Sequence, residues 1–257
     1  MNLDADIAIA HRLADAARAE ITPHFRTALD SEAKQDATPV TIADRNAEEA
    51  MRRILKAEVP GDAVFGEEFG SEPGRTNRQW VLDPIDGTTS FLAGRATFCT
   101  LIALLVDGFP VLGLIDQPIQ RERWLGVAGL PTTLNGKPVT TRTCRELSQA
   151  SLATTGPQYF SDEEGHVFMS LAAKTDHKRM VMGCDCYNYA CLATGQIDIV
   201  CEAGLKLHDF AALVPVVEGA GGIMSDWNGE PLHAGSDGRV LAIGDPARQE
   251  DVLEAMG

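Results

Sequence analysis

Apolar residues recur at helical spacing in the first part of the chain. Residues 3 to 28 predict an amphipathic helix and residues 41 to 57 a second one, because apolar positions three and four apart share one helix face. Between them, residues 29 to 40 are polar and end in Thr-Pro, which predicts a loop of the length often found in functional lids. The buried face of the first helix would carry Ile7, Leu13, Ala14, Ala17 and Ile21.

Short apolar runs bounded by turn residues follow the second helix. The predicted strands cover residues 63 to 66, 80 to 82, 97 to 106, 110 to 117 and 122 to 127. Tight turns are expected at Asp107-Gly108 and Asn135-Gly136. This part of the chain therefore predicts an antiparallel sheet covered by helices.

Strands and helices alternate after about residue 145. The strand signals lie near residues 151 to 155, 179 to 183, 197 to 201 and 239 to 243. The helical stretches lie near residues 161 to 175, 186 to 194, 208 to 219 and 246 to 256. The whole pattern predicts an α/β (α+β) protein with an amino-terminal half, residues 1–144, and a carboxy-terminal half, residues 145–257, with no linker between them.

Charge and composition narrow the classes of partner. The chain has 22 basic and 37 acidic residues, and its formal charge of −15 repels nucleic-acid backbones and anionic lipid surfaces. A hydrophobic fraction of 44% with 23% charged residues excludes a disordered chain. No apolar run approaches the roughly 18 residues of a membrane span, and the acidic start is unlike a signal peptide. We expect a cytoplasmic protein that binds neither nucleic acid nor membrane.

The cysteines indicate buried thiols rather than a metal or redox motif. Their spacing contains no C-x-x-C pair, so a zinc ribbon or a thioredoxin motif is not indicated. Cys184 and Cys186 alternate, which would place both on one side of a strand. The six cysteines are Cys99, Cys144, Cys184, Cys186, Cys191 and Cys201.

Two carboxylates, two hydroxyls and a glycine turn follow one apolar run within a short segment. Asp83 would sit at the end of the run, and Pro84 and Gly87 would turn the chain so that Asp86 comes back beside Asp83. The residues after Gly87 predict the first turn of a helix, whose free N–H groups favour an anion. A cation and a phosphate group could then meet here. Asp-Pro and Asp-Gly are also ordinary turn dipeptides, so a plain turn stays open.

Three more acids lie at the ends of predicted elements. Glu67 ends a short apolar strand, Asp44 lies near the start of the second helix, and Asp209 begins an apolar helix. Each could instead be a helix cap or a strand-end surface acid. Magnesium prefers oxygen ligands and keeps several waters, so a set of carboxylates without a histidine or cysteine cage favours that ion.

These blocks together resemble the inositol monophosphatase family of magnesium-dependent phosphomonoesterases. The resemblance is carried by Glu67, by Asp83-Pro84-Ile85-Asp86-Gly87-Thr88-Thr89, and by Asp209 with Ala211-Ala212 and Glu218-Gly219-Ala220-Gly221-Gly222. It extends over essentially the whole chain. It implies a layered α-β-α-β-α sandwich of the inositol monophosphatase and fructose-1,6-bisphosphatase type, with the metal site between the halves, and a homodimer.

The resemblance implies the following metal ligands. Glu67, Asp83 and the Ile85 carbonyl would hold a first Mg²⁺, and Asp83, Asp86 and Asp209 a second, with Glu67 sharing a weaker third. Divalent cations would neutralise charge on the phosphoryl oxygens and activate the attacking water.

The same resemblance assigns roles around the ions. Thr88 would orient the attacking water with Asp44 as its partner, beside the catalytic Glu67. The phosphate would bind at Gly87, Thr88 and Thr89, and Lys34 would belong to a mobile lid. Structural alternatives remain, because Thr88 could cap a helix and Lys34 could be a solvated loop residue.

Further blocks are similar to the histidinol-phosphate phosphatase branch, among them Gly183-Cys184-Asp185-Cys186-Tyr187-Asn188-Tyr189-Ala190. Glu202 has the spacing from Asp209 of the family glutamate that contacts the leaving group, and Asp185 is a second acid suited to a cationic amino alcohol. Three positions depart from expectation: Thr89 stands where that branch often has lysine, Ser90 where inositol monophosphatases usually have asparagine, and His208 where they usually have tryptophan.

We therefore expect a small phosphorylated metabolite as substrate, with L-histidinol phosphate favoured. The alternatives are an inositol-1-phosphate phosphatase, a broad sugar or nucleotide phosphate phosphatase of the same family, and a non-catalytic metal-binding scaffold. A surface acid at a strand end remains the structural reading of Glu202.

Overall fold

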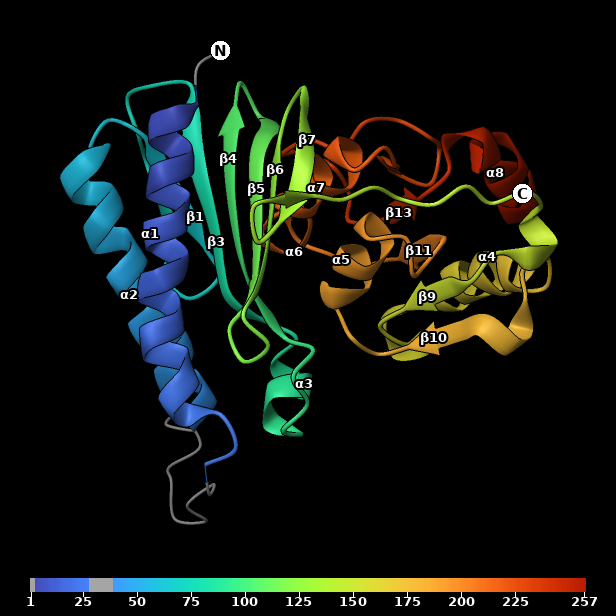
Figure 1. Ribbon diagram of the computed structural model, residues 1–257, viewed down its shortest axis with the longest axis horizontal. Helices are drawn as coiled ribbons and strands as arrows, with labels where there is room; N and C mark the ends of the chain where they lie inside the picture. Colours follow the sequence, from blue (N-terminus) through green and yellow to red (C-terminus); the bar gives the residue numbers. More distant parts are fainter. Residues whose placement is uncertain (1–2, 28–38) are drawn as a thin grey trace.

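Two sheets alternate with layers of helices in the computed structural model, which describes residues 3–27 and 39–257 (Figure 1). The pair α1 and α2 covers the outer face of the first sheet, and α5, α6 and α7 lie between the two sheets (Figure 1). Helices α4 and α8 cover the far side of the second sheet (Figure 1). The predicted α-β-α-β-α layering is therefore confirmed. Within the described residues no helix is long and apolar enough to cross a membrane.

The first layer is an antiparallel helix pair. Helix α1 (Asp4–Ile21) ends earlier than predicted and continues as a single 3-10 turn (Thr22–His24), because Pro23 has no N–H to donate to the preceding turn. Helix α2 (Pro39–Glu58) begins two residues before its predicted start at 41. The predicted lid residue Lys34 lies outside the described residues.

The first sheet has eight strands in the order β2-β1-β3-β4-β5-β6-β7-β8. Its neighbours are antiparallel except for β1 and β3, which pair in parallel, so the prediction of a purely antiparallel sheet was wrong at this edge. The reason is β2, which turns back along the outer side of β1 and lets the chain enter β3 from the same end as β1. The strands are β1 (Ala63–Gly66), β2 (Gly70–Glu72), β3 (Arg78–Asp86), β4 (Cys99–Val106), β5 (Phe109–Gln117), β6 (Glu122–Val127), β7 (Leu130–Leu134) and β8 (Lys137–Pro138).

The second sheet has five strands in the order β10-β9-β11-β13-β12. Strands β9, β10 and β11 are mutually parallel, and β13 pairs antiparallel with both β11 and β12. The strands are β9 (Leu152–Thr154), β10 (Met180–Met182), β11 (Ile199–Glu202), β12 (Ile223–Ser225) and β13 (Val240–Ile243). The helices of this half are α4 (Asp162–Ala172), α5 (Tyr187–Ala193), α6 (Leu207–Phe210), α7 (Leu213–Gly219) and α8 (Gln249–Met256).

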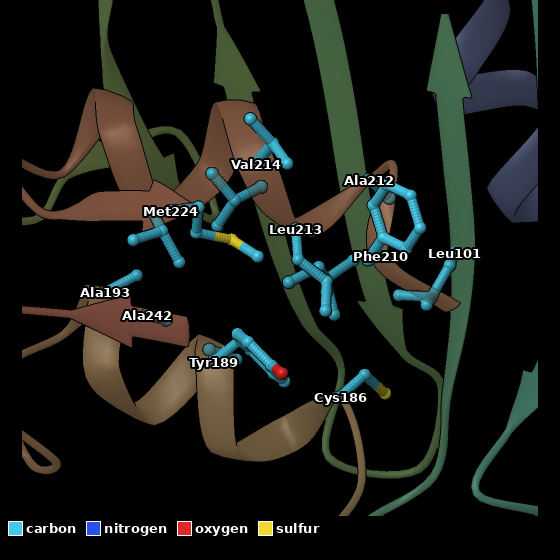
Figure 2. Close-up of a cluster of buried hydrophobic side chains, with 14 of the residues drawn as sticks. Leu101, Cys186, Tyr189, Ala193, Phe210, Ala212, Leu213, Val214, Met224 and Ala242 are labelled. Carbon is cyan, nitrogen blue, oxygen red and sulfur yellow. The ribbon is translucent and has the colours of Figure 1, made fainter. Parts of the chain in front are cut away.

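The predicted helix over 208 to 219 is two helices. Pro215 is tolerated in the first turn of α7 but cannot donate a hydrogen bond to the end of α6, so the helix breaks between Phe210 and Leu213. Both pieces contribute to one buried cluster that joins the two sheets (Figure 2). In Figure 2 the side chain of Leu101 from β4 faces the α6–α7 segment, and Tyr189 of α5 and Cys186, just before α5, approach from the other side.

Two glycines allow α7 to lie directly on the first sheet. A Cβ atom at Gly113 would come within 1.9 Å of the Ala212 carbonyl oxygen, and one at Gly126 within 2.2 Å of the Pro215 carbonyl oxygen. Any larger residue would push the helix away from the sheet. This close approach holds the α6–α7 segment against the sheet and so fixes the position of Asp209.

Candidate active site

A β-bulge turns two carboxylates toward the same side of the sheet. In β3, Asp83 pairs with Leu101 and Asp86 pairs with Cys99, so three steps along β3 match two steps along β4. Side chains alternate along a regular strand, and residues three apart would face opposite sides; the extra residue of a bulge removes this conflict. The predicted turn at Pro84 was wrong, because the strand continues to Asp86 and only Gly87, with φ 85°, turns the chain into α3 (Thr88–Leu92).

A strained turn before α5 closes one wall of the site. Cys184 and Asp185 have φ values of 81° and 43°, so Cys184 and Cys186 lie on a turn and do not alternate along a strand. The turn lets the Cys186 amide donate to Asp86 Oδ2 at 2.8 Å. Ser90 donates to Asp185 Oδ2 at 3.1 Å. Left-handed backbone at non-glycine residues is costly and concentrates at functional sites.

Gly87 makes room for this wall. A Cβ atom there would lie 2.8 Å from Asp185 Oδ2 and would need a left-handed conformation. The start of α3 and the turn at Asp185 can therefore approach each other only with glycine at this position.

Asp209 enters from the helix layer. It lies at the third position of α6, and its Oδ2 accepts a hydrogen bond from the Lys206 amide at 2.6 Å. One carboxylate oxygen from each of Asp83, Asp86 and Asp209 lies within 4.8 Å of the others. The distant Asp209 thus joins Asp83 and Asp86 in one carboxylate cluster.

Glu67 reaches the site from the β1–β2 turn, which a buried glutamate of α2 holds in place. Glu48 is fully buried, pairs with Arg52 at 2.7 Å and accepts the Glu68 amide at 2.8 Å. Gly66 leaves space for that carboxylate, because a Cβ atom there would lie 2.0 Å from Glu48 Oε1. Glu48 is a residue that sequence reasoning missed, since nothing in its helical context marks it as different from a surface acid.

Asp44 and Thr88 lie near this cluster without a hydrogen bond between them. The Thr88 hydroxyl donates to the Ile85 carbonyl at 3.2 Å, and Asp44 Oδ1 has no hydrogen-bond partner in the described part of the chain. Asp44, Glu67 and Glu68 each place one oxygen within 4.8 Å of the others. The partnership of Thr88 with Asp44 stays a prediction, and Glu68 is a further acid that the sequence reasoning did not assign to the site.

The charge in this region fits the binding of cations. Burial, and then the charges of Asp86 and Glu67, raise the pKa of Asp83 well above its usual range. Burial, with the neighbouring carboxylates, also raises the pKa of Asp44 to about 9. Asp83 Oδ1 is buried and has no hydrogen-bond partner among residues 3–27 and 39–257. Crowded, unpaired carboxylate oxygens are the donor set that Mg²⁺ or another hard dication would satisfy.

The carboxylates open into a cavity of about 310 Å³ that runs to the second sheet. Most of the predicted site residues line it: Glu67, Asp83, Ile85, Asp86, Gly87, Thr88, Thr89, Asp185, Glu202 and Asp209. The structure thus places these residues around one space, whereas Asp44 is not among the lining residues and lies beside Glu67 and Glu68.

The far end of the cavity contains a buried carboxylate with three fixed partners. Glu202 Oε1 accepts the amide and the hydroxyl of Thr155, at 2.8 and 2.5 Å, and Oε2 accepts the Tyr189 hydroxyl at 2.9 Å. Each carboxylate oxygen can accept two hydrogen bonds, so Oε2 keeps one free position. Tyr159, whose ring is half exposed, also lines this end. Thr155, Tyr159 and Tyr189 were not predicted, because no local motif connects them with Glu202.

Comparisons with known proteins place these features in context. The chain matches the sequence profile of the inositol monophosphatase family over residues 2–256. It is 47% identical to the chloroplastic bifunctional phosphatase IMPL2 of Arabidopsis thaliana, over 99% of this chain and 75% of the relative. It is 34% identical to the histidinol-phosphatase of Chlorobaculum parvum, over 98% of this chain and 96% of the relative.

A solved inositol monophosphatase from Zymomonas mobilis has a similar fold. The two chains superpose with a TM-score of 0.94 and are 52% identical, over 100% of this chain and 99% of the other. The similarity to phosphatases therefore extends to the whole length of the chain and to its architecture.

Proposed function

The chain belongs to the inositol monophosphatase family of phosphatases, and from this premise we propose that it hydrolyses L-histidinol phosphate to L-histidinol and phosphate in histidine synthesis. The observation that carries the proposal is one cavity lined both by the carboxylate cluster and by the acids Glu202 and Asp185. Histidinol-phosphatases among the relatives support this substrate.

We assign the cation-binding role to the carboxylate end. Glu67, Asp83 and the Ile85 carbonyl would hold one Mg²⁺, and Asp83, Asp86 and Asp209 a second. Bound cations would supply charge neutralisation for the phosphoryl group and activation of the attacking water. The raised pKa of Asp83 supports this assignment, because a cation relieves the repulsion among the carboxylates.

The chain's own groups would hold the reacting parts in position. The backbone N–H groups of Gly87, Thr88 and Thr89 would bind phosphoryl oxygens, and the Thr88 hydroxyl would accept or donate a hydrogen bond to the attacking water. Asp44 would fix the Thr88 hydroxyl if that hydroxyl turned away from the Ile85 carbonyl.

Glu202 would bind the cationic leaving group. Glu202 lines the same cavity as Asp185 and keeps one free acceptor position on Oε2, so an ammonium or imidazolium group bound there would meet two acids. Inositol could only exchange hydrogen bonds with the same groups. The substrate preference therefore rests on charge at this end of the cavity.

Glu202→Gln tests the proposal with little damage to the fold. The new amide oxygen can accept both Thr155 groups, and the amide nitrogen can donate to the Tyr189 oxygen, so the hydrogen bonds survive while the charge is lost. We expect kcat/KM for histidinol phosphate to fall about 10- to 150-fold, since a charge-assisted hydrogen bond contributes about 1.5–3 kcal/mol. The value for p-nitrophenyl phosphate should stay unchanged. An equal loss for both esters would mean that Glu202 serves the fold or the cation site.

A second candidate function is hydrolysis of inositol-1-phosphate or a broad range of sugar and nucleotide phosphates. It is favoured by the 52% identity to the Zymomonas mobilis inositol monophosphatase and by Thr89. A non-catalytic metal-binding scaffold is a third alternative, and phosphate release that stops on addition of a chelator would exclude it.

We further propose that the protein is a cytoplasmic homodimer. All six cysteines lie in the described part of the chain as free thiols, which supports a reducing compartment. The family resemblance supports the dimer, and β10 offers an exposed edge with Val181 and Met182. Light scattering coupled to size exclusion would measure the mass, and a value near 27.6 kDa would refute the dimer.

A further inference from the structure

A buried histidine lies beside the carboxylate cluster. His208 precedes Asp209 in α6 and is only 5% exposed. Its ring stacks on Phe65 of β1 with a centroid distance of 5.8 Å. A purely aromatic side chain would satisfy that packing, so the two ring nitrogens need a separate explanation.

The two ring nitrogens of His208 differ in their surroundings. Within residues 3–27 and 39–257, Nδ1 is buried and has no hydrogen-bond partner, and Nε2 lies 3.3 Å from Asp209 Oδ1. Leaving a buried ring nitrogen unpaired costs free energy unless something binds it. Metal-ligating histidines commonly have one nitrogen toward the ion and the other toward a carboxylate, which orients the ring.

His208 also lies close to two of the carboxylates, Glu67 and Asp83. One imidazole nitrogen of His208 and one carboxylate oxygen each of Glu67 and Asp83 lie within 4.8 Å of one another. The neighbouring cluster of Asp83, Asp86 and Asp209 contains oxygen donors only. Asp83 belongs to both groups, so the two positions are adjacent but differ in donor chemistry.

We propose that His208 is a nitrogen ligand at the Glu67–Asp83 position, which makes the two cation positions chemically unequal. The position with His208 therefore also accepts dications that bind imidazole well, such as Mn²⁺ or Zn²⁺, whereas the all-oxygen position favours Mg²⁺. The reason is that imidazole suits transition dications, whereas Mg²⁺ is bound through carboxylates, carbonyls and water. This inference refines the cation set of the proposed function and rests on it.

Pulsed EPR of the Mn²⁺-loaded protein tests the assignment directly. The wild type should show the ¹⁴N modulation of a coordinated imidazole, and His208→Phe, which keeps the ring stacked on Phe65, should not. Titration calorimetry should find the affinity for Mn²⁺ lowered about 10- to 100-fold in His208→Phe, with the affinity for Mg²⁺ changed far less. His208→Gln, which keeps a polar side chain, provides the same comparison if the phenylalanine variant does not fold.

Two results would overturn the proposal: a wild-type spectrum without ¹⁴N modulation, or equal losses of Mn²⁺ and Mg²⁺ affinity in a folded variant. Phosphate release from L-histidinol phosphate by the wild type, with Mg²⁺ as the only added dication, is measured on the same preparation. Phosphate release by a wild type that shows no ¹⁴N modulation refutes only the role of His208. Intact modulation in a wild type that releases no phosphate refutes the proposed function.

Discussion

Replacing Asp83 with Asn should change stability in opposite directions with and without cations. Asp83 is buried, and one of its oxygens has no hydrogen-bond partner in the described part of the chain. Its carboxylate faces Glu67 in one cluster and Asp86 and Asp209 in another. In a chelator these like charges oppose folding, so a neutral side chain of the same shape should stabilise the protein.

The size of the effect follows from the distances. At the 4.8 Å that bounds these clusters, a pair of full charges repels by roughly 3 kcal/mol at an effective dielectric constant of about 20. Crowded carboxylates bind protons, and this reduces the repulsion, so we expect a net gain of about 1–3 kcal/mol. For a chain of this size that gain corresponds to a rise in Tm of roughly 2–10 °C.

With saturating Mg²⁺ the wild type should instead be more stable than Asp83→Asn. Cation binding stabilises the wild type by about 2.7 kcal/mol at a hundred times Kd, and the variant loses a ligand shared by both positions. Activity should fall at least about a hundredfold, since a group that stabilises transition-state charge through the cations is lost. Differential scanning calorimetry measures Tm in EDTA and in Mg²⁺, and an assay of phosphate release measures the activity.

Asp198→Asn is the matched control. Asp198 is also buried, but it pairs with Arg142 and accepts the Ser151 amide at 2.7 Å, outside the cavity. Neutralising it should lower Tm in both solutions. If Asp83→Asn behaves in the same way, the Asp83 carboxylate stabilises the fold and the account of a cation site at this position is refuted.

Three further outcomes are expected. Gly66→Ala should lower the free energy of unfolding by about 2–4 kcal/mol in urea titrations, because the new Cβ displaces the Glu48 carboxylate from the Glu68 amide. Unchanged stability would show that the Glu48 side chain can move without cost. Thr88→Ala should lower kcat by about 10- to 100-fold, less than Asp83→Asn, because water can still attack from a less ordered position, and circular dichroism should show an intact fold. Burial alone would raise the pKa of Asp198, but hydrogen bonds from Arg142 and Ser151 lower it overall. The ionised Asp198 therefore stabilises the fold above about pH 4, and this stabilisation is lost as the pH falls further. Asp198→Asn should accordingly show a smaller loss of stability on acidification than the wild type.

The sequence predicted those parts of the site that depend on local patterns. Asp83, Asp86 and the glycine turn lie within one short segment, and the start of α3 directly after Gly87 is confirmed. Most helices and strands were also predicted, with ends shifted by a few residues, because hydrophobic periodicity records which face is buried. The strands missed were short or polar, such as β2 and β8, and their position depends on the strand beside them.

Other features depend on contacts between distant segments. The bulge that turns Asp83 and Asp86 to one side is defined by pairing with β4, and no residue of β3 alone specifies it. The left-handed turn at Cys184 and Asp185 lies between a predicted strand and a predicted helix, and the alternation of Cys184 and Cys186 gives no sign of its backbone conformation. The hydrogen bond from the Glu68 amide to Glu48, which holds the turn at Glu67 in place, also depends on α2 lying beside β1 and cannot be read from the local sequence.

The most direct test of the central claim is the release of inorganic phosphate by the wild-type protein from L-histidinol phosphate and from inositol-1-phosphate, side by side, in Mg²⁺ and in EDTA. We expect release that requires Mg²⁺, with a higher kcat/KM for histidinol phosphate. Release that continues in EDTA, or a higher kcat/KM for inositol-1-phosphate, would contradict the central claim.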